Sequence, residues 1–285
     1  MTILVTGASG HFGRLVVDSL LARGTAADTI VAGARDVSKV ADLAARGVRT
    51  ARVDYDDPAS LAEAFASIDA LLLVSGSEPG SRADGHRNVV SAAATAGVSR
   101  FVYTSAPKAD TFDWALGADH RATEAAIAES GLPAVVLRNN WYIENFVPDV
   151  QRAAESGVIA ASVGAAVIAP ATRADLAEAA AVVLLDDGHI GAVYELAGDT
   201  RVSYDDIAAA AAEVLERDVT YVWLTEAEHV AALEHAGLDT GTAAFVAGID
   251  AGIRDGVLDV EDATLSRLIG RPTTSFVDGI RAALS

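Results

Sequence analysis

The first thirteen residues constrain the fold of this chain more than any other stretch. Residues 2–6 form a largely apolar, β-branched run, which predicts a buried strand. Glycines follow at positions 7, 10 and 13, and the apolar residues 15–21 then predict a helix. Strand, glycine turn and helix in this order are typical of a fold that binds a dinucleotide. Gly7 permits the tight turn, Gly10 lets the backbone approach a pyrophosphate, and Gly13 lets the helix pack closely.

The glycine turn predicts a phosphate site, because backbone N–H groups and the positive end of the helix dipole would face it. A plain turn without a ligand is the alternative, but three glycines at this spacing serve little purpose in such a turn. We therefore expect cofactor contacts from Thr6, Gly7, Ser9, Gly10, His11, Phe12 and Gly13.

Further apolar segments predict additional strands, and helical segments separate most of them. The strands are expected over residues 28–34, 47–53, 68–74, 100–105 and 132–137. Successive strand–helix–strand units with nearly continuous apolar strands require a parallel sheet that helices cover on both faces. The sequence therefore predicts an α/β fold, a Rossmann-type doubly wound parallel sheet.

The pattern becomes looser after residue 150. Helices are expected over 171–185, 204–215, 226–235 and 242–253, and strands over 192–196 and 220–224. We expect a dinucleotide-binding domain over residues 1–150 and a smaller α/β lobe over residues 151–285, partly interleaved with the first. The substrate would bind in the crevice between them.

Composition narrows the class of protein. The chain has 285 residues, of which 51% are hydrophobic, so it can bury a full core. It has no cysteine, which excludes disulfides and thiolate metal sites. Its net charge of −19 disfavours nucleic acid as a partner. No basic leader or membrane-length apolar run is visible, so we expect a cytoplasmic protein without a membrane partner. His229 and His235 are expected at the surface, and no metal is expected.

The end of the second predicted strand indicates which nicotinamide cofactor is used. Arg35 follows this strand directly and Lys39 lies four residues later, and two cations favour the 2′-phosphate of NADPH. Asp36 is the competing feature. It either caps the helix expected over 37–45 or, with a shift of one residue, binds the ribose as in an NADH enzyme.

Polar residues at the ends of the later strands complete the expected cofactor site. Asp54 follows the third strand, where ligands bind in open parallel sheets, while Asp56 or Asp57 would cap a helix beginning at Pro58. Both roles are compatible. Further cofactor contacts are expected from Tyr55, Tyr103, Thr104, Ser105, Arg138 and Asn139. They are also expected from Ser75, Gly76 and Ser77, which would lie along the ribose and nicotinamide.

An aromatic segment follows the sixth predicted strand. Trp141, Tyr142 and Phe146 are expected to stack on a flat substrate, and Asn139 or Asn140 to donate a hydrogen bond. The alternative is an aromatic plug that packs the two lobes together.

Several motifs resemble a known family. Thr6-Gly7-Ala8-Ser9-Gly10 is similar to the T-G-A-[ST]-G signature of extended and atypical short-chain dehydrogenases. Residues 72–75, 86–89, 103–105, 137–145, 194–199 and 268–274 resemble the NmrA-like group, in particular bacterial NAD(P)H:quinone oxidoreductases of the second type. The resemblance spans nearly the whole chain.

The chain departs from typical short-chain dehydrogenases at the catalytic Tyr-x-x-x-Lys pair. The tyrosine place falls on Leu116 and the lysine place on His120. Alcohol–ketone interconversion is then a poor fit, because that reaction needs a positioned acid. The resembling branch also lacks this pair. His120 either holds the nicotinamide ribose or is an exposed helix residue paired with Glu124.

The resemblance implies a flavin-free quinone reductase that transfers a hydride from NADPH to a quinone. Asn139, Tyr142 or water would hydrogen-bond the developing oxyanion, and orientation would supply most of the catalysis. Two alternatives stay open: an NADP(H)-binding redox sensor without catalysis, and a reductase of azo or activated double bonds. Alanine-rich helices suit a homodimer as well as a monomer.

Overall fold

The structure is a computed structural model that describes residues 1–76, 82–114 and 116–285. Ser77, one of the expected cofactor contacts, lies outside the described residues. The chain divides into two compact units. The first comprises residues 1–106, 119–139 and 173–194, and the second comprises residues 107–118, 140–172 and 195–285.

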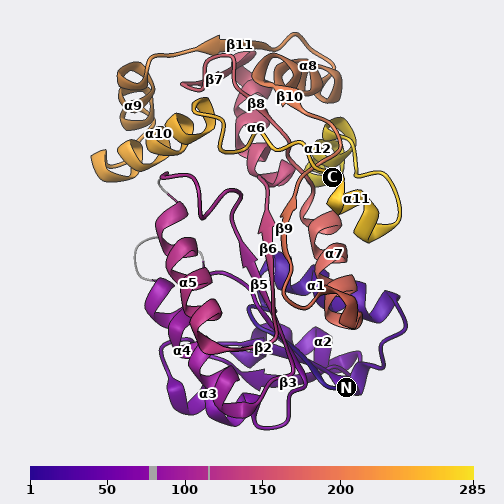
Figure 1. Ribbon diagram of the computed structural model, residues 1–285. Coiled ribbons are helices and arrows are strands. Elements are labelled where there is room, and N and C mark those ends of the chain that lie inside the picture. Colours follow the sequence, from indigo (N-terminus) through magenta and orange to yellow (C-terminus); the bar gives the residue numbers. More distant parts are fainter. Residues whose placement is uncertain (77–81, 115) are drawn as a thin grey trace. The chain divides into compact units, whose positions relative to one another are not determined.

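One seven-stranded sheet organises the first unit (Figure 1). Across the sheet the strands are β3 (Arg49–Arg52), β2 (Ile30–Ala34), β1 (Ile3–Val5), β4 (Ala70–Leu73), β5 (Arg100–Ser105), β6 (Ala134–Asn139) and β9 (Val193–Leu196). Neighbours run parallel, so that Leu4 pairs with Val31 on one side and Leu71 on the other. The predicted Rossmann-type sheet is confirmed. Its strand order reverses between β1 and β4, and ligands bind at the carboxyl ends of strands at such a point.

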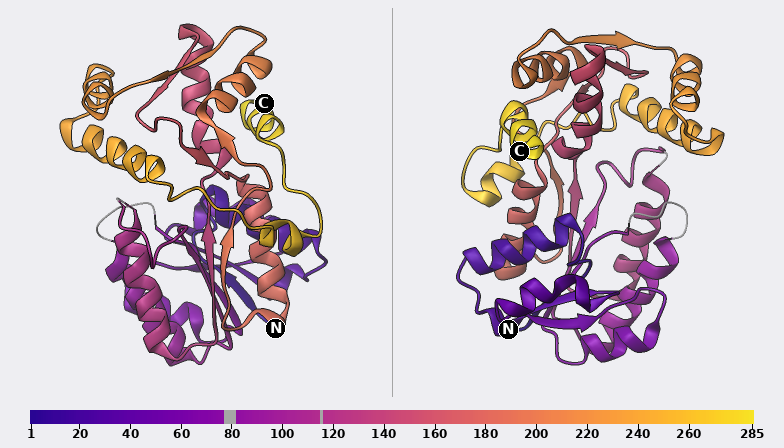
Figure 2. Two further views of the ribbon diagram at one scale, coloured as in Figure 1. Left: turned by 45° about the horizontal axis from the view of Figure 1, so that its top comes forward. Right: turned by 180° about the vertical axis from the view of Figure 1, so that it is seen from behind.

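Helices cover both faces of this sheet (Figures 1 and 2). One face carries α1 (His11–Ala22), α2 (Ala41–Ala45) and α7 (Arg173–Leu185), and the other carries α3 (Pro58–Phe65), α4 (Arg82–Ala96) and α5 (Gly117–Ser130). Short 3-10 turns lie at η1 (Ala27–Thr29), η2 (Val37–Val40) and η4 (Asp187–His189). The strand expected over 100–105 matches β5 to the residue.

Apolar strands build the core of the first unit. Every residue of β1, β2, β4 and β5 is buried. Phe65, Phe101 and Tyr103 are among the largest fully buried side chains, and each such burial contributes roughly 1.5–3 kcal/mol. A side-chain cap fixes the start of α3: the carboxylate of Asp57, one of the two predicted caps, accepts from the amides of Ala59 and Ser60.

The second unit combines short strands with helices. Its elements are η3 (Ile143–Phe146), α6 (Val147–Ser156), β7 (Val158–Ala161), β8 (Val167–Ile168), β10 (Val202–Ser203), α8 (Tyr204–Leu215), β11 (Thr220–Trp223), α9 (Glu226–His235), α10 (Thr240–Arg254), α11 (Thr264–Ile269) and α12 (Phe276–Leu284). β8 pairs antiparallel with β10, and β7 pairs parallel with β11. The helices expected over 204–215 and 226–235 match α8 and α9.

The two units interleave along the chain: residues 107–118 and 140–172 belong to the second unit, and residues 173–194 return to the first. One expectation needs correction. His229 is buried rather than exposed: its Nδ1 lies 2.9 Å from Asp250 Oδ2 and 3.3 Å from Ser162 Oγ. His235 is exposed, as expected. Among the described residues, no helix combines the length and apolarity needed to cross a membrane.

Candidate dinucleotide site

The glycine turn between β1 and α1 has the geometry that its sequence predicts. Gly7 has a φ of +60°, a left-handed conformation that favours glycine. A Cβ on Gly13 would lie 2.5 Å from the carbonyl oxygen of Gly7, so no larger residue fits there. Gly10 is the N-cap of α1 and supplies no side-chain cap. The turn therefore forms a backbone cradle, and the first amides of α1 are available to an anion.

The hydroxyl groups of Thr6 and Tyr55 brace the ends of β1 and β4. Thr6 Oγ1 accepts from the amide of Val74 at 3.0 Å and lies 2.5 Å from Tyr55 Oη. Tyr55 Oη donates to the Val74 carbonyl at 2.8 Å. Burial raises the pKa of Tyr55, so its phenol stays protonated. Both hydroxyls are committed to the protein, which favours a supporting role over the expected direct cofactor contact.

The expected 2′-phosphate residues lie beyond β2. Arg35 and Lys39 are exposed, and within the described chain neither side chain forms an ion pair. Asp36 accepts from the Ser38 hydroxyl at 2.6 Å and from the Ser38 amide at 3.0 Å, and both bonds lower its pKa. The capping alternative for Asp36 is confirmed, although the capped element is the 3-10 turn η2. Arg14 holds η2 by donating to the Lys39 carbonyl at 3.0 Å.

Asp54 ends β3 and interacts with its own neighbours. Its Oδ2 lies 3.1 Å from Arg52 Nη2, and its Oδ1 accepts from the amide of Asp56 at 3.3 Å. The side chain remains 25% exposed. A partly exposed carboxylate at a strand end is compatible with the expected cofactor contact.

Ser75 and Gly76 follow β4, and side chains from β5 and α4 hold them. The Ser75 amide donates to Thr104 Oγ1 at 2.8 Å, and the Gly76 amide donates to His86 Nε2 at 3.1 Å. Arg82 Nη1 donates to the Gly76 carbonyl at 3.0 Å. Thr104 thus positions the segment that the sequence assigned to the ribose and nicotinamide.

His120 lies in the interior of the first unit. It is 5% exposed, and its Nδ1 lies 2.7 Å from Oη of the fully buried Tyr103. Burial, aided by the guanidinium of Arg82, lowers the pKa of His120 to about 3. The alternative of an exposed helix residue paired with Glu124 is wrong. The burial of Tyr103 also argues against a direct cofactor contact by its side chain.

Glu124 instead binds two other expected site residues. It accepts from Ser105 Oγ at 2.5 Å, and from Arg138 Nε at 3.0 Å and Nη2 at 2.6 Å. Ser105 and Arg138 are buried, so these bonds compensate for their lost hydration. Their polar groups thus support the carboxyl end of the sheet.

Asn139 ends β6 with an unsatisfied amide. The residue is 7% exposed, and among the described residues neither its Oδ1 nor its Nδ2 has a hydrogen-bond partner. A buried amide without partners costs about 1–3 kcal/mol, so such groups are rare unless a ligand or water completes them. This observation agrees with the expected role of Asn139 in binding.

The aromatic residues of the expected substrate site belong to the second unit. Phe146 is 2% exposed and packs edge-on against Tyr204 and Phe276. This packing inside the unit favours a core role for Phe146 over substrate contact. Trp141 and Tyr142 are only partly buried, so their rings retain exposed surface.

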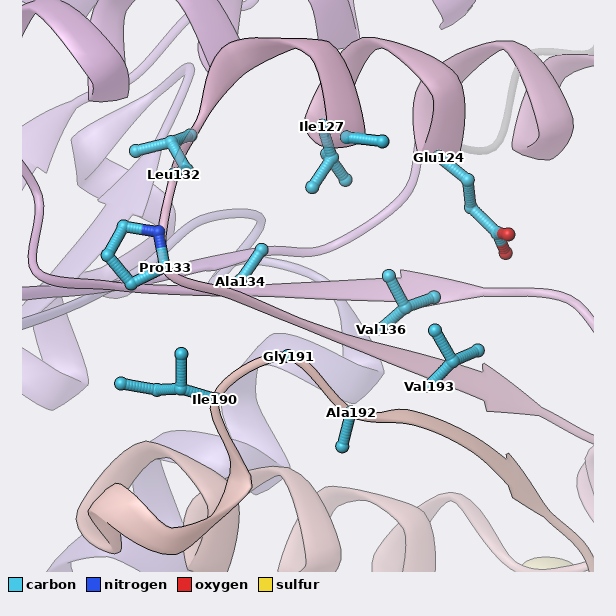
Figure 3. Close-up of a pocket in the computed structure, with 11 residues that line it drawn as sticks. Glu124, Ile127, Leu132, Pro133, Ala134, Val136, Ile190, Gly191, Ala192 and Val193 are labelled. Atoms are coloured by element: carbon cyan, nitrogen blue, oxygen red, sulfur yellow. The ribbon is translucent and has the colours of Figure 1, made fainter.

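An apolar groove in the first unit is lined by Glu124 and by residues outside the expected cofactor and substrate site. It measures about 360 Å³, and α5, the start of β6 and the segment before β9 supply its lining (Figure 3). Pro133 and Ala134 mark the amino end of β6, whereas Asn139 marks the carboxyl end. The groove is therefore not the dinucleotide site.

Comparison with known proteins now places the chain in a family. The model of the NAD(P)H-binding family matches residues 7–187, which span the glycine turn, β4, β6 and α7. The chain belongs to this NAD(P)H-binding family. The match confirms the class of cofactor that the glycine turn predicted.

Relatives of full length are known. Quinone oxidoreductase 2 of Escherichia coli is 43% identical over 278 residues, covering 98% of this chain and 97% of that protein. The crystal structure of the E. coli NADPH-dependent quinone oxidoreductase in complex with NADPH superposes with a TM-score of 0.96 at 42% identity, covering all of both chains. The predicted resemblance to quinone oxidoreductases of the second type is confirmed.

More distant relatives reduce dyes. The Citrobacter sp. triphenylmethane reductase complexed with NADP(H) has a TM-score of 0.94 and 34% identity, covering 99% of this chain and all of that one. An NAD(P)H azoreductase of Xenophilus azovorans is 27% identical, covering 98% of this chain and 97% of that protein.

Two residues of the site were not anticipated from sequence. Arg82 and His86 hold the Gly76 peptide, as described above, yet the sequence assigned neither of them to the site. His86 falls within a family-like motif at 86–89, which was the one available signal. A motif of this kind marks a position without saying what its side chain touches.

Proposed function

We propose that this protein is a flavin-free NADPH:quinone oxidoreductase. The observation that carries the proposal is the full-length identity of 43% with quinone oxidoreductase 2 of E. coli. The chain's own geometry supports it. The glycine turn, in which Gly13 leaves no room for a Cβ beside the Gly7 carbonyl, suits a pyrophosphate. The side-chain amide of Asn139, which has no hydrogen-bond partner among the described residues, suits a polar ligand group.

NADPH, when bound, supplies a hydride from C4 of its nicotinamide, and a quinone takes up this hydride and one proton to give a hydroquinone. The amides at the start of α1 would bind the pyrophosphate, and Arg35 and Lys39 the 2′-phosphate. Asn139 would hold a polar group near the reacting ring. These contacts orient the reactants, which can supply much of the rate enhancement.

The protein's own titratable groups fit a reaction without a dedicated acid. His120 is neutral at pH 7 because its pKa is about 3, so it cannot act as a general acid there. Burial raises the pKa of Tyr103, to which His120 is hydrogen-bonded. Water or Tyr142 would then protonate the quinone oxygen, and His120 would act as a neutral hydrogen-bonding group. Trp141 and Tyr142 retain the proposed substrate role.

A stopped-flow experiment tests the proposal. Purified protein, NADPH and a benzoquinone are mixed without flavin, and the loss of nicotinamide absorbance is followed. We expect stoichiometric conversion to hydroquinone and a lower rate with NADH. Binding of NADPH without any turnover would instead identify a redox sensor.

A second class of acceptor deserves the same assay. The azoreductase and triphenylmethane reductase relatives favour dyes with extended conjugation as alternative substrates. An azo dye and a triphenylmethane dye should be compared with the quinone by their kcat/KM values. A larger value for a dye would replace the quinone as the preferred acceptor.

We further propose a cytoplasmic protein whose partner is the small-molecule acceptor rather than a nucleic acid. The net charge of −19 supports this, since it opposes binding to phosphate backbones. A homodimer is compatible with the alanine-rich helices, and light scattering of the purified protein measures that state directly.

A further inference from the structure

Ser75 and Gly76 stand at the point where the strand order of the sheet reverses. They follow β4, which lies beside β1, and this is the position at which a dinucleotide fold places its ligand. Both amides of this segment point to protein side chains, Ser75 to Thr104 and Gly76 to His86. The path of the segment therefore depends on these two acceptors.

A count of protons fixes the tautomer of His86. The Gly76 amide is a donor, so His86 Nε2 must carry a lone pair. A neutral ring that accepts at Nε2 carries its proton on Nδ1, which lies 2.9 Å from Thr123 Oγ1. Thr123 Oγ1 can in turn donate to the Asp119 carbonyl at 2.8 Å. His86 is consequently the neutral tautomer with its proton on Nδ1.

The surroundings of His86 oppose a charge on the ring. The side chain is fully buried, and the rings of Tyr55 and Tyr103 pack edge-on against it. Burial is the main cause that lowers the pKa of His86 to about 4, and the guanidinium of Arg82 adds to it. The carboxylate of Asp119 acts in the opposite direction but is paired with Arg82 Nε at 3.1 Å. His120, the other nearby titratable ring, is itself neutral because its pKa is about 3.

We propose that His86 is a positioning residue of the dinucleotide site, whose Nε2 holds the Gly76 amide and so sets the path of the segment beside the nicotinamide half of the cofactor. The proposal rests on the proposed NADPH-dependent function. Arg82 complements it by holding the carbonyl of the same residue. The peptide groups on both sides of Gly76 are thus fixed before a cofactor arrives, which reduces the ordering cost of binding.

Two substitutions separate this role from simple packing. In His86→Gln, the side-chain oxygen reaches about as far as Nε2 and can still accept from Gly76. In His86→Asn, the shorter amide reaches only the place of Nδ1, so it keeps the bond to Thr123 and leaves the Gly76 amide unpaired. We expect about tenfold weaker NADPH binding for His86→Asn, the equivalent of one unsatisfied buried donor, and a change within about twofold for His86→Gln.

Calorimetry with two ligands locates the effect. NADPH reports on the whole site, whereas adenosine 2′,5′-bisphosphate reports on the adenine end alone. We expect His86→Asn to weaken NADPH and leave the bisphosphate unchanged. Equal losses for both ligands, or no loss for NADPH, would overturn the proposal. Failure of the unchanged protein to bind NADPH would instead overturn the proposed function.

Nuclear magnetic resonance tests the hydrogen bond in the unchanged protein, so the inference does not depend on a variant that folds. A scalar coupling across the hydrogen bond between the Gly76 amide nitrogen and His86 Nε2 is expected at pH 7, with the ring proton on Nδ1. NADPH, but not adenosine 2′,5′-bisphosphate, should shift the Gly76 amide resonance. A proton on Nε2, or an unmoved Gly76 resonance in the NADPH complex, would contradict the proposal.

Discussion

Arg138 and Glu124 form a buried ion pair in which both carboxylate oxygens accept from the guanidinium, at 3.0 and 2.6 Å. Their side chains are 9% and 13% exposed. The pair joins the carboxyl end of β6 to α5. The Ser105 hydroxyl, at the end of β5, donates to the same carboxylate. Breaking such a pair from one side is costly, because it leaves a buried charge without its counterion.

The first prediction concerns this ion pair. Glu124→Ala should lower the free energy of unfolding by about 3–5 kcal/mol, since the buried guanidinium of Arg138 would lose the carboxylate that accepts two of its hydrogen bonds. Glu213→Ala is the matched control: it removes an exposed pair with Arg281, worth about 0–1 kcal/mol. Urea unfolding measures both. Equal effects of the two substitutions would show that Arg138 gains solvent when Glu124 is absent.

A second prediction concerns the glycine cradle. Gly13→Ala should weaken NADPH binding at least about tenfold, because the added Cβ would displace the Gly7 carbonyl and with it the phosphate-binding amides. Gly241→Ala is the control, because its Cβ would meet only the movable carboxylate of Asp239. Titration of nicotinamide fluorescence measures the affinity. Unchanged affinity in Gly13→Ala would exclude this turn as the pyrophosphate site.

Asn139 gives a prediction in which stability and activity move apart. Asn139→Leu removes a buried amide without partners, so unfolding should become harder or stay unchanged. Its kcat/KM with NADPH and a quinone should fall by about 100-fold if the amide holds a reacting group. Thermal unfolding and steady-state kinetics on one preparation provide both values. A stable, fully active variant would remove Asn139 from the mechanism.

Cofactor choice yields a fourth prediction. Arg35→Ser should weaken NADPH binding about tenfold and leave NADH binding unchanged, because the lost cation meets only the 2′-phosphate. Arg49→Ser, at an exposed position on β3, is the control for a general loss of positive charge. The loss should shrink at high salt, since the site is exposed to solvent. A parallel loss of NADH affinity would mean that Arg35 acts elsewhere on the cofactor.

The two buried histidines predict acid sensitivity. The folded-state pKa values of His86 and His120 are about 4 and about 3, below the ordinary value of 6.5. The unfolded chain therefore takes up protons first as the pH falls below 6.5. The free energy of unfolding should therefore fall progressively from pH 6.5 toward pH 4, by up to about 1.4 kcal/mol per pH unit for each histidine.

His120→Asn isolates one of these contributions. Its amide can replace Nδ1 as the partner of Tyr103 Oη but does not titrate, so unfolding should become less steeply dependent on pH. His235→Asn, at an exposed position, should leave the slope unchanged. An unaltered slope in His120→Asn would mean that His120 is accessible to protons in the folded state.

Local sequence signals account for most of the sheet and for the glycine turn. Apolar runs located the strands of the first unit, and Asp36 and Asp57 were recognisable as caps because capping acts over two or three residues. The two-residue strands β8 and β10 were missed, since a pattern of alternation needs more residues to be visible.

Side-chain environments were the part that sequence could not supply. His120 was compatible with exposure until the fold placed Tyr103 beside it, and His229 was expected at the surface until α10 brought Asp250 to it. Thr6 and Tyr55 were recognised by position, but their mutual hydrogen bond joins residues 49 apart in sequence. Such contacts depend on tertiary structure rather than on spacing.

The return of residues 173–194 to the first unit has a consequence for biosynthesis and for protein engineering. α1 packs against α7, and β9 forms one edge of the sheet. A nascent chain that ends at residue 150 therefore lacks both α7 and β9. The nucleotide-binding half should therefore acquire its native hydrogen-exchange protection only after the ribosome has released residue 194. A fragment cut at the apparent midpoint of the gene product would expose the apolar flank of α1 and aggregate.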